Sequence, residues 1–98
     1  MYVIVLHDIK DPQTAFPRGE RLMRNEGAPA GTRVLQFYPA DDASFVTCLL
    51  EAKSVDGVQR WVDETLGDST VNRTYAVDAE QAFARQPLGI AESNAVSA

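Results

Sequence analysis

The clearest pattern of apolar and polar positions lies in the middle of the chain, in the segment FVTCLLEAKSVDGVQRWVDETL from Phe45 to Leu66. Every second residue from Val46 to Ala52 is apolar, which is typical of a strand with one face beneath a helix. Beyond this strand, apolar residues recur at intervals of three and four on one helical stripe: Val55, Val58, Trp61, Val62 and Leu66. Ser54 is placed as the N-cap of this helix and Gly67 as its stop. The segment therefore predicts a buried strand followed by an amphipathic helix.

Three further strands are predicted by short runs of apolar and β-branched residues. Residues 2–9, YVIVLHDI, are almost continuously apolar, which favours a central strand covered on both faces. The other two runs are TRVLQFY at 32–38 and VNRTYAV at 71–77. The turn-forming segment PADDA at 39–43 precedes the strand 45–52, so we expect 32–38 and 45–52 to form an antiparallel hairpin.

A first helix is predicted between the first two strands. Asp11 and Pro12 make a favourable helix start, as N-cap and first helical residue. Pro17 lacks an N–H and its ring clashes with the preceding turn, so we expect a short turn before it and a separate or kinked helix over 18–25. The residues of this helix that should face the sheet are Leu22 and Met23.

The end of the chain is predicted to hold a short helix and a tail. Asp78 can cap a helix over 79–85, AEQAFAR, and Pro87 would end it. The remaining residues are small and polar. We therefore expect a single domain over 1–86 and a C-terminal tail over 87–98.

The predicted order of elements is βαββαβ. Right-handed crossovers around a central hairpin lead to an α+β, ferredoxin-like fold: a four-stranded antiparallel sheet of order 4-1-3-2 with both helices on one face. We expect the uncovered face to carry Val3, Val5, His7, Gln36, Tyr38, Phe45, Thr47, Leu49, Arg73, Tyr75 and Val77. Because so apolar a face is unfavourable in water, we expect two copies to pack these faces together as a homodimeric α/β barrel.

Charge and composition disfavour several classes of partner. The formal net charge of the 98 residues is −5, and no basic patch suits a nucleic acid or an anionic membrane surface. No apolar run approaches the roughly 20 residues of a membrane span. Cys48 is the single cysteine, which excludes an internal disulfide and fits a reducing, cytoplasmic location. Its place in the apolar alternation predicts a buried structural thiol and not a nucleophile.

The residues also resemble a known family. The element order resembles the small ferredoxin-like, dimeric α/β-barrel proteins, and CLLEAKSVDGVQRWVDETLG is similar to the third strand and second helix of a small nickel-binding family among them. That family pairs a histidine of the first strand with one of the second helix. His7 in VLHD matches the first position, whereas Val62 in VQRWVDE stands at the second. The resemblance therefore implies the fold without the metal site, and we expect neither a metal nor a cofactor.

The candidate site is predicted at one end of the sheet. His7, the sole histidine, should end the first strand near the start of the fourth, where it could act as a catalytic base or a polar contact. The competing interpretation is a hydrogen-bonded histidine without a chemical role. The residues that we expect to bind a ligand are Gln36, Tyr38, Thr47, Arg73 and Tyr75.

The acidic residues have simpler explanations than catalysis. The pair at 41–42 is typical of a turn, and the pair at 63–64 of a solvated helix face. Glu51 ends a strand on the open face and needs a partner, which we expect to be Lys53, Arg33 or a residue of the other subunit. No acidic cluster matches a calcium loop and no glycine cluster a phosphate loop.

Three functions remain open on this evidence. The leading hypothesis is a homodimer that binds a small, mainly apolar molecule in a cavity at the sheet or the dimer interface. The second is a cofactor-independent monooxygenase or isomerase that uses His7 as its base. The third is a metal-binding relative that has lost a ligand.

Overall fold

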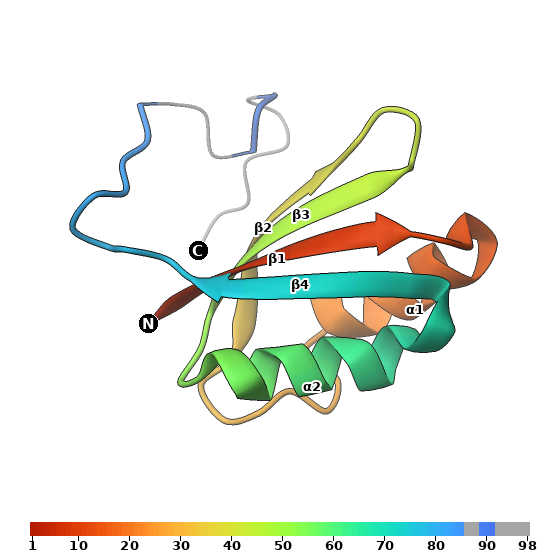
Figure 1. Cartoon of the computed structure of the whole chain (residues 1–98), viewed down its shortest axis with the longest axis horizontal. Helices are drawn as coiled ribbons and strands as arrows, with labels where there is room; N and C mark the ends of the chain where they lie inside the picture. Colours follow the sequence, from red (N-terminus) through yellow and green to blue (C-terminus); the bar gives the residue numbers. More distant parts are fainter. Residues whose placement is uncertain (86–88, 92–98) are drawn as a thin grey trace.

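The computed structural model describes residues 1–85 and 89–91. Its elements are β1 (Tyr2–Ile9), α1 (Pro12–Met23), β2 (Arg33–Pro39), β3 (Phe45–Glu51), α2 (Val55–Leu66), the 3₁₀ turn η1 (Gly67–Ser69) and β4 (Thr70–Ala76). The strands form one antiparallel sheet in the order β2-β3-β1-β4, and both helices lie on one side of it (Figure 1). The predicted ferredoxin-like fold is therefore confirmed, sheet order included. Each predicted strand agrees with the observed strand to within one residue at either end.

The register of β1 decides which of its side chains face the helices. Partners across an antiparallel pair point to the same face of the sheet. His7 lies opposite Val46 of β3 and opposite Asn72 of β4, and Val46 is buried in the core. The residues of β1 that face the helices are thus Val3, Val5 and His7, so their predicted place on the open face is wrong. Because β1 is apolar on both faces, its own alternation could not show which face was which.

The core lies between the sheet and α2. The predicted stripe of α2 is confirmed, because Val58, Trp61, Val62 and Leu66 are all buried. The Ser54 hydroxyl accepts a hydrogen bond from the Gly57 N–H at 3.0 Å, as expected of an N-cap. The Trp61 indole N–H donates to the Glu26 carbonyl at 2.9 Å, so its one polar atom is satisfied inside the core.

Helix α1 is continuous through Pro17, which corrects the predicted break. Pro17 removes one backbone hydrogen bond, to the carbonyl four residues earlier, near the start of the helix. Ala15 and Leu22 are buried on either side of it, and this packing holds the helix together. Leu22 faces the sheet as predicted, whereas the Met23 side chain is half exposed.

Residues 77–85, which follow β4, form a turn and no helix. The Asp78 carbonyl accepts hydrogen bonds from the N–H groups of Gln81 and Ala82, at 3.2 and 2.9 Å. The segment leaves the sheet on the side opposite the helices (Figure 1), and Phe83 is 81% exposed. The predicted helix over 79–85 is therefore wrong, because so short a helix needs an apolar face packed on the domain. The predicted tail over 87–98 lies largely outside the described residues.

Candidate functional site

The predicted site residues lie on two opposite faces of the sheet. Five of them share the open face by their pairing within the sheet: Gln36, Tyr38, Thr47, Arg73 and Tyr75. His7 lies on the other face, beneath the helices. The structure therefore separates the expected base from the expected ligand contacts, and the roles of these residues stay predictions.

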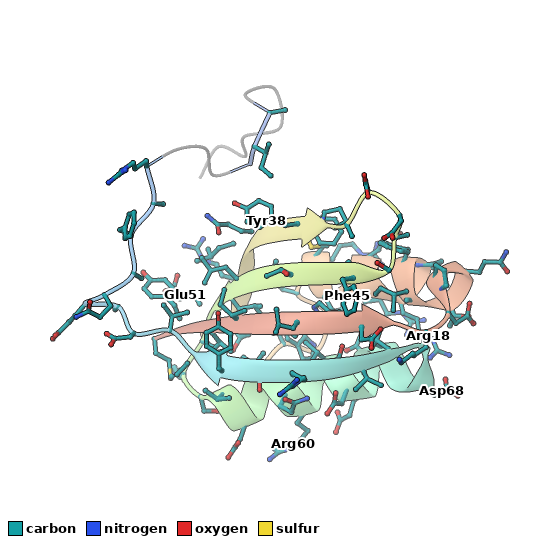
Figure 2. All side chains as sticks on the ribbon, turned by 45° about the horizontal axis from the view of Figure 1, so that its top comes forward. Arg18, Tyr38, Phe45, Glu51, Arg60 and Asp68 are labelled. Carbon is teal, nitrogen blue, oxygen red and sulfur yellow. The ribbon has the colours of Figure 1, made fainter. Side chains whose placement is uncertain are left out.

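A hollow of about 310 Å³ is present on the open face where the strand ends meet. Thr47 and Arg73 line it as predicted, together with Phe45. Leu6 and Asp8 stand where His7 was expected, because the even-numbered residues of β1 point to this side. Figure 2 looks onto this face and labels Tyr38 and Phe45.

A second cavity, of about 40 Å³, lies between α1 and the sheet. Its walls are almost entirely apolar, and small residues of α1, Ala15 and Gly19, form one side. Met23 and Phe37 also line it and are 51% and 40% exposed, so the cavity reaches the surface beside them. The volume exceeds the roughly 10–15 Å³ that one water needs. The cavity can therefore hold water or the polar end of a ligand whose body lies toward this mouth.

Two polar side chains line this apolar cavity. His7 is 3% exposed and Thr70, the first residue of β4, is 6% exposed. Among the described residues, the Thr70 Oγ1 atom has no hydrogen-bond partner. Burying an unpaired hydroxyl is unfavourable by about 1–3 kcal/mol in proteins, so such atoms are rare. Among the described residues, the Thr70 hydroxyl is the one buried side-chain polar group without a partner.

A hydrogen-bond network behind His7 connects it to α2. The His7 Nδ1 atom lies 2.7 Å from Asn72 Oδ1, and Asn72 Nδ2 donates to Asp63 Oδ1 at 2.9 Å. The side-chain amide of Gln59 donates to both Asp63 oxygens, at 3.1 and 3.0 Å, and to the Asn72 carbonyl at 3.0 Å. Asp63 lies on a solvated helix face as expected, and its exposed side chain also accepts a hydrogen bond from Asn72 of β4.

Sequence reasoning missed Thr70, Asn72 and Asp63. Asn72 and Thr70 sit in a strand of mixed composition, and neither residue type at that spacing indicates a site. Their importance arises from the register, which places Asn72 opposite His7 and Thr70 opposite Ile9. A useful clue would have been the polar side chain at every second position of β4, at residues 70, 72 and 74, on the face toward the helices.

Burial keeps both ionisable groups of the cavity neutral near pH 7. The pKa of His7 is lowered from its usual value, because desolvation outweighs the opposing effects of the Asn72 hydrogen bond and the Asp63 charge. Burial raises the pKa of the Cys48 thiol to about 12. Cys48 is therefore poorly suited to act as a nucleophile, in keeping with its predicted structural role.

The other expectations meet few direct observations. Arg33 forms an ion pair with Glu51 across β2 and β3, at 3.4 Å, so Glu51 has a partner within the chain. In the part of the chain that the structure describes, no three His, Cys, Asp or Glu side chains gather as a metal site would require. No helix among residues 1–85 and 89–91 has the length and apolarity to cross a bilayer. No family model, curated protein or solved structure matches this chain.

Proposed function

We propose that this protein binds a small, mainly apolar molecule whose one polar group enters the cavity between α1 and the sheet. The observation that carries the proposal is the buried Thr70 hydroxyl, which has no partner among the described residues and lines the same apolar cavity as His7. A polar atom of a ligand that reaches the hydroxyl would satisfy it and offset the free energy lost by burying it. The apolar body would then lie at the mouth of the cavity, beside Met23 and Phe37.

The composition of α1 supports the same proposal. Gly19 lies in the interior of α1, where glycine destabilises a helix by about 1 kcal/mol relative to alanine. A Cβ atom built at Gly19 would have no atom within 4 Å, so nothing crowds this position. The glycine therefore leaves space beside the cavity at the expense of helix stability, which is a pattern expected of a binding site.

Ligand titrations of matched variants test the proposal. Phenol and cyclohexanol, as probes, should raise the melting temperature and shift the NMR signals of residues lining the cavity. Gly19→Leu should abolish both effects because its side chain fills the cavity, while the better helix former keeps the protein folded.

The control for this experiment is Thr47→Leu, which fills the hollow on the open face instead. It should leave the response to both probes unchanged. Loss of binding in Thr47→Leu with normal binding in Gly19→Leu would place the ligand on the open face and contradict the proposal.

We also propose that the protein is a homodimer formed through the open face. Large hydrophobic side chains are exposed there: Tyr2, Leu6, Phe45, Val71 and Tyr75. The charged residues of this face balance, with Asp8 and Glu51 against Arg33 and Arg73, although the whole chain carries a net charge of −5. A second copy can therefore approach without concentrating like charges at the contact.

A catalytic role of His7, a metal-binding role and the cytoplasmic location stay predictions. Binding is favoured over catalysis because the described residues supply a cavity and two polar contacts. None of them places a second acid or base beside His7 that would indicate a reaction. The further chemistry of this histidine depends on its protonation.

A further inference from the structure

Asp63 determines how the Asn72 amide is oriented. An ionised carboxylate can only accept hydrogen bonds, so the Asn72 atom bonded to it must be the NH₂ group. The amide oxygen of Asn72 then faces His7, at 2.7 Å from Nδ1. The opposite orientation would place two acceptors against each other at Asp63. Gln59 strengthens this arrangement, because its own NH₂ group donates to the same carboxylate.

The orientation of Asn72 in turn determines which nitrogen of His7 carries the proton. An amide oxygen accepts, so Nδ1 must donate and hold the hydrogen. In the neutral imidazole the other nitrogen, Nε2, then carries a lone pair. Nε2 has no hydrogen-bond partner among the described residues, and the ring lines the cavity. The cavity therefore contains one acceptor, Nε2, and one hydroxyl, that of Thr70.

The charges around the cavity disfavour an anionic ligand. Among the described residues that line it, the ionisable groups are His7 and Cys48, both neutral near pH 7. The part of α1 that lines it contributes none, and the nearest charge behind His7 is the negative Asp63. A carboxylate or phosphate would lose its hydration without gaining a cation.

We propose that Asp63 and Asn72 act as positioning residues that hold His7 as its Nδ1–H tautomer, so that Nε2 and the Thr70 hydroxyl select a neutral ligand with a hydroxyl group of the phenol or enol kind. This inference rests on the proposed binding function and names the ligand class of the same cavity. The ligand hydroxyl donates a hydrogen bond to Nε2. The oxygen of the same hydroxyl, or a neighbouring acceptor of the ligand, accepts a hydrogen bond from the Thr70 hydroxyl. A ligand without the donor leaves Nε2 unpaired among apolar walls.

The tautomer can be measured without any ligand. Because His7 is the sole histidine of the 98 residues, ¹⁵N-histidine labelling gives the spectrum of a single imidazole. Long-range ¹H–¹⁵N NMR should show a protonated Nδ1 and an unprotonated Nε2.

Asp63→Asn should shift the population toward the Nε2–H form, since the side-chain amide of Asn72 can then turn over. Glu64→Gln removes the same charge from the next residue of α2 and should change nothing. A wild-type protein with Nε2 protonated, or identical spectra of the two variants, would overturn the inference.

The ligand class is tested with phenol and anisole, in which a methyl group replaces the hydroxyl hydrogen. Phenol should bind at least roughly tenfold more tightly than anisole, a ratio that corresponds to one hydrogen bond. The preference should vanish in Asp63→Asn and persist in Glu64→Gln. It should also weaken as the pH falls through the pKa of His7, which burial lowers from its usual value, because the imidazolium has no lone pair.

The outcomes separate the two proposals. Equal binding of phenol and anisole would overturn the inference about the hydroxyl and leave the binding function standing. If neither probe binds although the Nδ1–H tautomer is observed, the proposed binding function is contradicted and the ligand class with it.

Discussion

His7 and Thr70 show how the surroundings of a residue decide its chemistry. Both are ordinary strand residues by composition, and both become unusual because the sheet places them at an apolar cavity. Thr74 lies four residues after Thr70 in β4 and has the same side chain. Its hydroxyl donates a hydrogen bond to Gln59 at 2.7 Å. The difference between these two threonines is therefore one of hydrogen bonding and not of residue type.

Replacing each threonine by valine tests this difference. Thr70→Val removes a hydroxyl that has no partner among the described residues, so the free energy of unfolding should stay unchanged or rise by about 1 kcal/mol. Thr74→Val removes a bonded hydroxyl and should lower it by about 1 kcal/mol. Urea unfolding of the ligand-free protein measures both. A loss of stability in Thr70→Val equal to that in Thr74→Val would mean that an ordered water satisfies Thr70.

At the scale of elements, a hydrogen bond connects α1 to the C-terminal end of α2. Arg18 of α1 donates from Nη1 to the Leu66 carbonyl at 3.0 Å, at the C-terminus of α2. Gly67 follows with φ of 58° in the left-handed region, and a Cβ there would lie 2.7 Å from Arg18 Nη1. A cation at a helix C-terminus satisfies a free carbonyl and interacts favourably with the helix dipole. Arg18 therefore couples the position of α1, one wall of the cavity, to α2.

Truncation of this arginine should loosen that coupling. Arg18→Ala should lower the free energy of unfolding by about 1–2 kcal/mol, the range for a hydrogen bond with a charged donor that is partly exposed. Arg21→Ala is the control, because Arg21 is an exposed residue of the same helix whose side chain forms no hydrogen bond or ion pair with the described residues of α2. It should change stability by less than about 0.5 kcal/mol. Chemical denaturation compares the two, and equal effects would show that the hydrogen bond from Arg18 to the Leu66 carbonyl adds nothing measurable to stability.

The elements also show where local pattern was sufficient. The strands and α2 were predicted closely, because period-two and period-3.6 burial are written directly into their residues. The break at Pro17 and the helix over 79–85 were wrong for one reason. Local propensity argued against a continuous helix at Pro17 and for a helix over 79–85, whereas packing decided both. Helix α1 buries Ala15 and Leu22, and Phe83 stays 81% exposed with no core to pack on among the described residues.

At the scale of the whole molecule, the open face of the sheet is the feature on which the proposed dimer depends. Helices cover the other face, and an uncovered, largely apolar sheet face is typical of an interface. In a twofold dimer each residue of the face meets the same face of the partner. A single substitution on this face therefore changes the contact at two symmetry-related positions.

This symmetry makes the proposed dimer easy to test. The wild-type protein should have the mass of a dimer by light scattering, and Phe45→Glu should convert it to a folded monomer, because it buries two charges at the contact. Phe83→Glu is the matched control: Phe83 is even more exposed but lies beyond β4, and its substitution should leave the dimer intact. A wild-type monomer at micromolar concentration would contradict the proposal, as would a dimer that both variants preserve.

The amino-acid sequence by itself determined the strands, the amphipathic helix α2, their order and thus the fold, because each depends on residues that are neighbours along the chain. It also singled out His7, the one residue of the cavity that chemistry alone makes conspicuous. Tertiary structure decided the face on which His7 lies, since β1 is apolar on both sides and only its pairing with β3 and β4 distinguishes them. It likewise decided the partners of His7. Asn72 is 65 residues away in the chain and Asp63 lies on another element, so their contacts arise only when the sheet and α2 pack together.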